Sequence, residues 1–418
     1  KRNRLNFMNQ MKGNCMAIFN SNDIYPVSAD SELPFAQHRD MFHLAGIDQE
    51  ETILILYPSS KDSKTREILF IRRSDEHTKI WEGEKLSKDL ASKLSGIESI
   101  HFVEDFKNIL HLITSKVDTF YINKNEHYRA NSPVETREDR FISWLLKKYP
   151  AHKVAKSNPI LQRLRSIKHI DEIDQIRKAC QITKKGFNRV LKFIKPDIWE
   201  YQIEAEFIHE FINNSSKGFA YSPIIASGQD NNVLHYVKNN KQCKDGELIL
   251  MDVGAEYGNY SSDMTRTIPV SGHFSKRQKE IYNTVLRVKN EATKLLTVGN
   301  NWKNFHDQVG EIMTKELLDV NLLDKADIKN QTKKNPAYKK YFMHGTSHHL
   351  GLDTHDYGLL EDIFQENMVF TVEPGIYIPE EGFGVRLEDD VVIQTKGEPI
   401  NLMEDIPIET DHIEELMN

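Results

Sequence analysis

The stretch ELILMDVGAEYGNYSSDMTRTI, residues 247–268, places two aspartates in a setting that favours buried strands. Asp252 lies inside the apolar run LILMDV, which is typical of a strand covered on both faces. Asp263 follows it, and Gly258 lies near the midpoint between the two. If a hairpin turns at Gly258, both aspartates lie on paired strands about equally far from the turn. Directly opposed residues have Cβ atoms roughly 4.5–5.5 Å apart, so the stretch predicts two neighbouring carboxylates.

Two interpretations of this pair are open. A carboxylate inside an apolar run costs free energy unless an opposite charge or a metal ion compensates it. Two bare carboxylates also repel each other, and a pair of divalent ions roughly 3.5–4 Å apart would relieve that repulsion. The structural alternative is that Asp252 is buried against an arginine and Asp263 lies in a loop. This stretch by itself does not decide between a metal site and that alternative.

Two glutamates near the end of the chain lie in similar apolar patterns. Glu373 closes the run MVFTVE and precedes a Pro-Gly turn, and Glu388 lies within GVRLEDDVVI. Either glutamate alone would be read as an ordinary strand residue. With the two aspartates they make four carboxylates, which would balance the charge of two divalent ions. Carboxylates combined with imidazole suit Mn, Fe, Co or Zn.

The segment MHGTSHHLGLDTHD, residues 343–356, holds four of the 17 histidines of the chain. A polar surface loop would account for it without any chemistry. A metal site also accounts for it, if some of these histidines bind metal and others contact a substrate. The four carboxylates favour the metal site.

The composition is that of a globular protein with more than one core. The length of 418 residues predicts two domains. Hydrophobic residues make up 39% and charged residues 28%, which excludes disorder as a class. The formal net charge of -7 gives no sign of the basic surface that a nucleic-acid partner would favour.

The cysteines and the apolar segments indicate in which cellular compartment the protein is located. Cys15, Cys180 and Cys243 are widely spaced and odd in number, so a reducing compartment fits better than a disulfide framework. We find no apolar segment of about 18 residues for a membrane span, and no signal-peptide core follows the basic N-terminal residues. We therefore expect a cytoplasmic protein with no membrane partner. The chain begins with Lys1 rather than Met, which leaves its true start open.

Patterning predicts two domains of different character. In residues 1–166, strands and helices alternate, which is typical of an α/β domain. In residues 167–418, helices, strands, helices and strands follow one another, which is typical of α+β. The expected strands are 52–57 and 67–73, paired as a hairpin, and 117–122, 368–378 and 384–394, besides those within 222–268. The expected helices are 85–96, 103–115, 197–214, 276–296 and 302–318, and one capped by Asp171 with an apolar face of Ile173, Ile176, Cys180 and Phe187.

In this order the motifs resemble the metallopeptidases of the pita-bread fold: aminopeptidase P, prolidase and, more distantly, methionine aminopeptidase. The motifs are the two aspartates with ten residues between them, HGTSHHLGLDTHD, VEPGIY and RLEDD. Other stretches resemble aminopeptidase P, namely FAQHRDMFHLAGI (35–47), IWEGEKL (80–86), LRSIKHIDEIDQIRKACQIT (164–183) and IIASGQDNNVLHY (224–236). The resemblance implies an α+β fold in which a pita-bread (creatinase/aminopeptidase-like) catalytic domain follows a creatinase-like N-terminal α/β domain.

The resemblance also implies the metal ligands. Asp252 would bind one metal ion, Asp263 and Glu388 would bridge two, and His348 and Glu373 would complete the other. The implied cofactor is two divalent ions, with Mn²⁺ preferred and Co²⁺ or Zn²⁺ as alternatives.

Further residues match the family's positions near the substrate. They are His235, His344, His355, Arg386 and Tyr377. Taken alone, His235 would be read as a core histidine, and Arg386 could equally be the structural partner of a carboxylate. His349 stands at a variable position and is expected to take no part. We assign no chemical role to His43, His169 or His209.

The implied activity is hydrolysis of the bond between the first residue of a peptide and a following proline. Two divalent ions lower the pKa of a bridging water so that hydroxide forms near neutral pH, and Glu373 can take the proton as general base. His235 or His355 can stabilise the developing oxyanion or pass a proton to the proline nitrogen. The implied partners are a proline-containing peptide and copies of the chain in a homodimer or homotetramer.

Three alternatives remain open at this stage. Prolidase, which cleaves Xaa-Pro dipeptides, shares every metal ligand, although the N-terminal stretch and the tail look more like aminopeptidase P. Methionine aminopeptidase lacks a comparable N-terminal domain. A catalytically silent pita-bread module would have lost ligands, whereas all five stand in this sequence.

Overall fold

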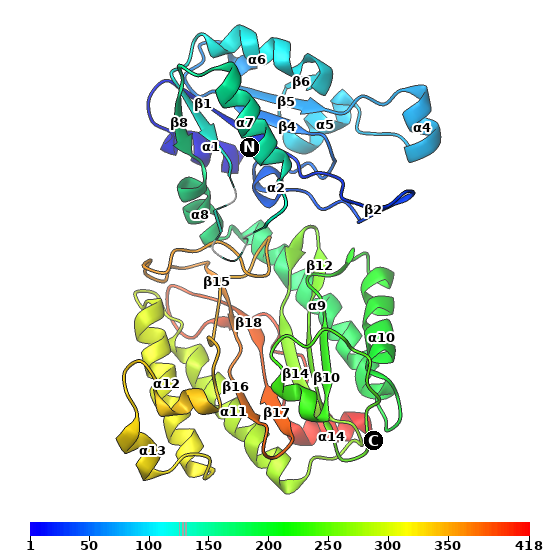
Figure 1. The fold of residues 1–418 in the computed structure, drawn as a ribbon, viewed down its shortest axis with the longest axis vertical. Coiled ribbons are helices and arrows are strands. Elements are labelled where there is room, and N and C mark those ends of the chain that lie inside the picture. Colours follow the sequence, from blue (N-terminus) through cyan, green and yellow to red (C-terminus); the bar gives the residue numbers. More distant parts are fainter. Residues whose placement is uncertain (125, 128, 130–131) are drawn as a thin grey trace. The chain divides into compact units, whose positions relative to one another are not determined.

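The structure is a computed structural model that describes residues 1–124, 126–127, 129 and 132–418. It divides into two compact units, which we call unit 1 (Lys1–Arg165) and unit 2 (Ser166–Asn418). Each unit has its own sheets (Figure 1).

Unit 1 is built on a six-stranded mixed sheet. Its strands, in sheet order, are β6 (Ser99–Phe102), β5 (Glu67–Ile71), β4 (Ile53–Leu56), β1 (Cys15–Asn20), β7 (Thr119–Ile122) and β8 (Lys153–Lys156). The predicted hairpin is present as β4 and β5, which pair antiparallel, and the strand predicted over 117–122 is β7. β4 also runs antiparallel to β1, whereas β1, β7 and β8 are mutually parallel.

Helices cover both faces of this sheet, as an α/β domain requires. Along β1, Met16 and Ile18 contact one apolar core, while Cys15, Ala17 and Phe19 contact the other, which is the period of two that a strand imposes. The helices on the first face are α6 (Phe106–Thr114) and α7 (Arg137–Lys148), and those on the second are α1 (Arg2–Gln10), α2 (Arg39–Ala45), α5 (Lys88–Ser95) and α8 (Asn158–Ser166). The remaining short elements are β2 (Pro26–Ser28), β3 (Ser31–Glu32), α3 (Ser63–Arg66) and α4 (Glu76–Glu82).

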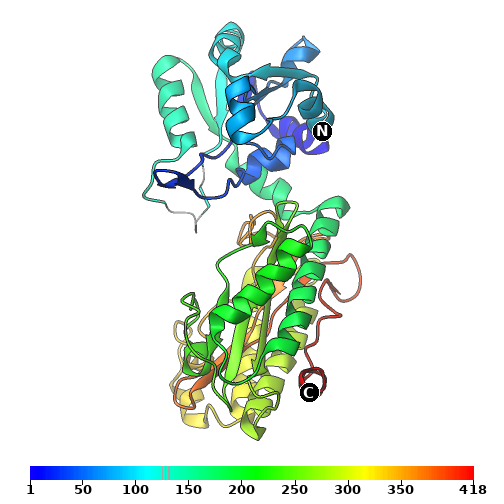
Figure 2. The ribbon, with the colours of Figure 1, turned by 90° about the vertical axis from the view of Figure 1, so that its right-hand side faces the viewer.

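Unit 2 combines long helices with short sheets, in the predicted order. Its helices are α9 (Ile170–Phe193), α10 (Glu200–Asn213), α11 (Lys276–Leu295), α12 (Trp302–Asp319), α13 (Lys325–Asn330) and α14 (Thr410–Met417). The sheets are β10 (Ile224–Ser227) with β11 (Leu248–Val253) and β14 (Met264–Pro269); β15 (Val369–Val372) with β18 (Asp389–Val392) and β19 (Ile400–Asn401); β9 (Gly218–Phe219) with β12 (Ala255–Tyr257) and β13 (Tyr260–Ser261); and β16 (Gly375–Ile378) with β17 (Phe383–Arg386). Figures 1 and 2 show α9 and α10 side by side along these strands.

Of the helices within the described ranges, none combines the length and the apolar composition needed to cross a membrane. The three cysteines are buried and unpaired, in agreement with the expectation of no disulfide framework.

The predicted cap of α9 is wrong, although its predicted apolar face is right. His169, not Asp171, is the N-cap: its Nδ1 accepts from the backbone N–H of Asp171 at 3.3 Å. Glu172 completes the cap by accepting from the backbone N–H of His169 at 2.9 Å. An imidazole nitrogen can thus serve as the acceptor usually supplied by an aspartate. The four predicted face residues, Ile173, Ile176, Cys180 and Phe187, are all buried.

The predicted hairpin between the two aspartates exists, but the aspartates are not directly opposed. The chain turns at Gly258 and Asn259, which both have positive φ (58° and 68°). Asp252 stands opposite Thr265, so Asp263 lies diagonally across from it. The cause is the position of the turn, because Tyr257 stands opposite Tyr260 and the same register continues to Asp252 and Thr265.

Candidate metal centre

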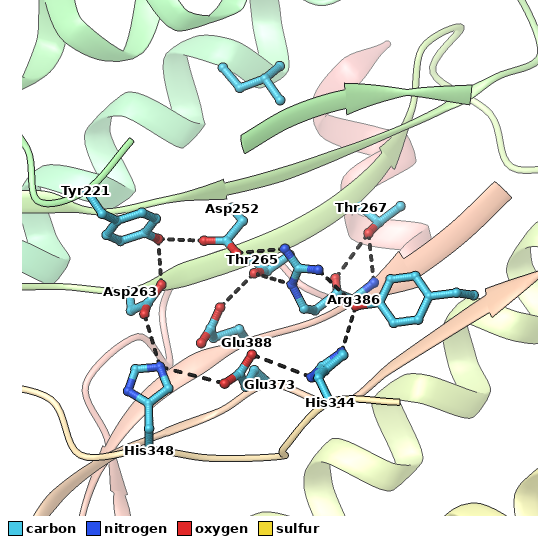
Figure 3. A network of polar contacts seen from close by, with 12 residues as sticks. Tyr221, Asp252, Asp263, Thr265, Thr267, His344, His348, Glu373, Arg386 and Glu388 are labelled. Carbon is cyan, nitrogen blue, oxygen red and sulfur yellow. Dashed lines mark hydrogen bonds and ion pairs between the residues drawn. The ribbon is translucent and has the colours of Figure 1, made fainter. Parts of the chain in front are cut away.

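The five predicted ligands come together between the two main sheets of unit 2 (Figure 3). They are Asp252 on β11, Asp263 directly before β14, His348 before β15, Glu373 directly after β15 and Glu388 between β17 and β18. The backbone holds the two sheets in contact, because the N–H of Glu388 donates to the carbonyl of Thr265 at 3.0 Å. Residues more than 130 positions apart are thereby gathered at one place.

Three of these residues are arranged to hold one ion. Asp263, His348 and Glu388 each offer a ligand atom, and these atoms all lie within 4.8 Å of one another. His348 Nε2 is 3.5 Å from Asp263 Oδ2 and 3.6 Å from Glu373 Oε1. Glu373 therefore borders the group.

The backbone orients the imidazole of His348. Its Nδ1 donates to the carbonyl oxygen of His349 at 2.9 Å, which leaves the lone pair of Nε2 facing Asp263 and Glu373. A ligating histidine is commonly fixed in this way by a partner on its other nitrogen. The ring of His355 stacks on His348, with centroids 3.9 Å apart, and limits its rotation.

The carboxylates destabilise one another's charge. Burial, followed by the charge of Asp252, raises the pKa of Asp263 well above its usual range. Burial and the charges of Asp263 and Glu373 do the same to the pKa of Glu388. Burial raises the pKa of Glu373 to about 7, although nearby His348 opposes the rise. A concentration of oxygen donors whose negative charge is poorly compensated fits a divalent cation, and the single imidazole is compatible with Mn, Co or Zn.

Both oxygens of Asp252 are engaged by protein donors. Tyr221 O–H lies 2.6 Å from Oδ1, and Arg386 Nη2 donates to Oδ2 at 2.7 Å. The Tyr221 hydroxyl also lies against Asp263, and its single proton can be donated to only one of the two carboxylates at a time. The structural alternative for Asp252, an arginine partner, is thus present alongside the cluster.

Tyr221 was missed in the sequence. It lies in the irregular segment after β9, and neither periodicity nor a motif distinguishes it in KGFAYSP. Burial, followed by the charges of Asp252 and Asp263, raises the pKa of its hydroxyl well above its usual range. It therefore stays protonated and remains a hydrogen-bond donor to the acidic cluster.

Arg386 links the metal centre to His344. Its Nη1 donates to the Tyr377 hydroxyl at 2.8 Å, and that hydroxyl lies 2.7 Å from His344 Nε2. His344 Nδ1 donates to the carbonyl of Gly345 at 2.7 Å, so Nε2 is the acceptor of the Tyr377 proton. Burial and the charge of Arg386 lower the pKa of His344 to about 3. His344 is consequently a neutral imidazole at physiological pH.

His235 approaches the same group from an exposed loop. After burial and the charge of Arg386, the charge of His235 also lowers the pKa of His344. The solvent-exposed position of His235 excludes the alternative of a core histidine.

A buried glutamate holds the loop that carries His235. Glu200, at the start of α10, is 0% exposed. Its Oε1 accepts from the backbone N–H and the hydroxyl of Ser227, at 2.8 and 2.7 Å. Its Oε2 accepts from the Tyr236 hydroxyl and the backbone N–H of Lys241, both at 2.9 Å. The loop between β10 and β11 is therefore tied down directly beside His235.

The histidines without an expected role lie apart from this cluster. The His349 ring packs against Phe370 and Trp302, with centroids 4.6 and 5.6 Å apart, and burial lowers its pKa well below the usual range. His169 caps α9, and His209 is an exposed residue of α10.

Comparison with known proteins gives the family. Residues 174–395 match metallopeptidase family M24. The chain belongs to this family. Residues 1–121 match the aminopeptidase P N-terminal domain. An M24 protein is a hydrolase, and membership implies that the centre binds divalent metal.

The relatives match over most of their length. Xaa-Pro aminopeptidase of Escherichia coli K12 is 32% identical, over 100% of this chain and 97% of that protein. Xaa-Pro aminopeptidase 3 of Homo sapiens is 32% identical, over 95% of this chain and 79% of that protein. A solved structure of zinc-substituted E. coli aminopeptidase P with product is 31% identical, with a TM-score of 0.90 over 100% of this chain and 97% of that one. These matches confirm the predicted fold, a pita-bread domain preceded by an aminopeptidase P-type N-terminal domain.

The raised pKa values predict an unusual pH dependence of stability in the metal-free protein. A group whose pKa is higher in the folded than in the unfolded state stabilises the fold below its unfolded pKa, and this contribution is lost as pH rises through the folded pKa. For Glu373 the window runs from about 4.5 to about 7, and the loss is at most about 3 kcal/mol. We expect metal-free wild type to lose stability between pH 5 and pH 8 relative to metal-free Glu373→Gln.

Urea denaturation of chelator-treated protein at the two pH values measures this difference. Loading with Mn²⁺ should abolish the wild-type loss, because the ion stabilises the ionised carboxylates. An equal pH response of wild type and Glu373→Gln would show that Glu373 is not titrating in this window.

Glu200→Gln should impair catalysis through the loop of His235. The amide nitrogen cannot accept from the donors that now bind one of the carboxylate oxygens, so the loop must shift. We expect kcat to fall by roughly tenfold with a small change in KM, and we expect stability to fall by about 1.5–3 kcal/mol for a lost hydrogen bond to a charged group.

A double-mutant cycle with His235→Ala separates positioning from general damage. Glu200→Gln should have little further effect on kcat once the His235 side chain is absent. Glu206→Gln, on the same helix but paired with Arg189, is the matched control. Additive effects of Glu200→Gln and His235→Ala would contradict the coupling.

Proposed function

We propose that this metallopeptidase is a Xaa-Pro aminopeptidase, which releases the N-terminal residue of peptides that have proline in second position. The observation that carries the proposal is the full-length match to Xaa-Pro aminopeptidases, N-terminal domain included. All five expected ligand residues are also present and gathered in unit 2. The full-length match favours this activity over prolidase, and the complete ligand set favours catalysis over a silent module.

The proposed ligand set is Asp252, Asp263, His348, Glu373 and Glu388, which would hold two divalent ions, with Mn²⁺ preferred. When bound, such ions lower the pKa of water and polarise a carbonyl oxygen. Asp263 and Glu388 are proposed as the residues that both ions would share. Asp252 would have to share its oxygens between metal and its present donors, Tyr221 and Arg386.

The protein's own groups supply proton transfer and positioning. Glu373 is proposed to act as general base. His344 is neutral and lies beside it, with Nδ1 3.8 Å from Glu373 Oε2. His235 and His355 are proposed to stabilise the oxyanion or to protonate the departing proline nitrogen. Arg386 donates hydrogen bonds to Asp252 and to Tyr377, and it thereby connects the proposed metal ligands to His344.

Proline explains why a dedicated site is required. The bond before proline lacks an N–H, and the ring fixes φ near −65°. A site that recognises peptides by that N–H cannot bind this bond productively, so recognition must come from the shape of the pocket and from histidine donors.

Several further properties are proposed on the same basis. Residues 1–166 would form the N-terminal domain and residues 167–418 the catalytic domain. The protein would be cytoplasmic, would not bind nucleic acid or membrane, and would form a homodimer or homotetramer. Size-exclusion chromatography with light scattering tests the oligomeric state.

His348→Ala should abolish activity while leaving the fold largely intact, because its ring ends in the ligand cluster while its backbone is held by neighbouring strands. We expect kcat/KM to fall by more than about a hundredfold. That is a larger loss than is typical when a residue that hydrogen-bonds to a metal ligand is removed. Metal content by mass spectrometry and the thermal midpoint should be recorded with it. His209→Ala, on an exposed face of α10, is the control, and full activity of His348→Ala would refute the ligand assignment.

Product analysis tests the proposed reaction. Protein stripped of metal and reloaded with Mn²⁺ is offered a Xaa-Pro dipeptide and a Xaa-Pro-Yaa tripeptide side by side. Release of the first residue from the tripeptide, well above the rate for the dipeptide, is the expected result. Cleavage of the dipeptide alone would indicate prolidase, and cleavage of neither with metal bound would indicate a silent module.

A further inference from the structure

Unit 1 contains a cavity of about 480 Å³ on the sheet face that α6 and α7 cover. It lies where β1 ends at Asn20 and β4 begins at Ile53, and both residues line it. The remaining lining residues come from the start of α6, the segment before it, and α7. In sheets of this kind, ligands commonly bind beyond the carboxyl ends of parallel strands. β1 and β7 are parallel to each other, so their carboxyl ends lie at the same edge of the sheet.

One wall of the cavity is aromatic. Phe106, Phe141 and Trp144 line it, with ring centroids 5.8 to 6.4 Å apart. Phe106 is buried, whereas Phe141 and Trp144 are only partly buried. The rings of Phe141 and Trp144 therefore lie at the boundary between the apolar core and the cavity. A ligand with an apolar or aromatic body would complete that core.

The cavity also holds a guanidinium that forms no direct ion pair within the described part of the chain. Arg137 is partly buried and lines the cavity, yet its guanidinium makes no hydrogen bond or ion pair with any described residue. Its neighbours differ: Arg140 pairs with Asp23 at 2.7 Å, and Lys107 lies 5.5 Å over the Trp144 ring. Burial lowers the pKa of Arg137, and the charges of Glu51 and Asp23 only partly oppose this effect. An anion in the cavity would stabilise the guanidinium further.

The side chains that line the cavity carry more positive than negative charge. Three lining side chains are cationic, Arg137, Arg140 and Lys107, and one is anionic, Glu104. Glu138 follows Arg137 in α7 but faces Asn20, whose amide donates to Oε2 at 2.7 Å. Burial raises the pKa of Glu138 to about 8, so it adds little negative charge at neutral pH. Its Oε1 is buried without a hydrogen-bond partner among the described residues.

We propose that this cavity binds a small carboxylate with an aromatic or apolar body, its carboxylate on Arg137 and its body against Phe106, Phe141 and Trp144. A carboxylate matches the planar, bidentate donor geometry of a guanidinium. The volume lies within the usual range of small-molecule sites. This site lies wholly in unit 1, and it does not depend on the proposed peptidase activity. The ligand is either a free acid or the carboxyl terminus of a peptide, which share this chemistry.

The test uses the metal-loaded full-length protein and 3-phenylpropionate as the probe. Isothermal titration calorimetry and saturation-transfer NMR should show saturable binding, weakened by about tenfold or more in Arg137→Gln. Lys148→Gln removes the same charge from the exposed end of α7 and should bind like wild type. The uncharged 3-phenylpropanamide and the ring-free propionate should both bind at least about tenfold more weakly than 3-phenylpropionate.

Two further arms locate the site and its ligand source. His348→Ala should leave binding unchanged, which separates this cavity from carboxylate binding at the metal centre. Acetyl-Gly-Gly-Phe binding more tightly than 3-phenylpropionate would identify a peptide terminus as the ligand, and the reverse order would identify a free acid. Absence of saturable binding up to about 10 mM, or equal binding to wild type and Arg137→Gln, would overturn the proposal. A Trp144→Leu variant that keeps full affinity would also overturn it.

Discussion

Repulsion among four carboxylates is the constraint on which the catalytic unit depends. Asp252, Asp263, Glu373 and Glu388 come from separate strand ends and meet in a largely buried space. Arg386, which forms an ion pair with Asp252, is the one direct cation partner of these carboxylates within the described ranges apart from the histidines. Burial and mutual repulsion raise the pKa values of the other three, which favours their protonated forms when no ion is bound. A divalent ion takes the place of those protons, which is why such a site is built where burial alone would forbid it.

The short sequence Glu388-Asp389-Asp390 shows how the scaffold withstands this repulsion. Glu388 faces the ligand cluster, whereas Asp389 pairs on the other side with Arg266 at 2.7 Å and with Lys289. Asp390 accepts from the backbone N–H of Asp263 at 3.0 Å and thereby fixes a ligand in the neighbouring sheet. These three consecutive acids therefore divide their roles: Glu388 faces the metal centre, whereas Asp389 and Asp390 hold its walls.

The sequence could predict those parts of the molecule that local pattern controls. Asp252 was identified because a carboxylate interrupts an apolar strand, and the buried face of α9 because its apolar residues recur at helical spacing. The diagonal register of Asp263 was missed for a local reason, because the turn at Gly258 and Asn259 lies one residue beyond the midpoint of the two aspartates. Other parts that it could not predict depend on contacts distant along the chain. Tyr221 and Glu200 gain their roles only from partners that folding brings to them. The cap of α9 was missed for a different reason, since histidine is an uncommon acceptor at that position.

The metal centre is therefore better viewed as a closure between two preformed sheets than as the origin of the fold. The sheets are already joined without metal by the Glu388 N–H on Thr265, by the Thr265 hydroxyl on Glu388 at 2.6 Å, and by the buried Arg266–Asp389 pair. A scaffold fixed in this way sets ligand positions before the ion arrives, so little ordering is required on binding. The same scaffold prevents the carboxylates from moving apart when the ion leaves. Protonation is then the remaining way to relieve their repulsion, and metal binding and proton release are two sides of one equilibrium in this protein.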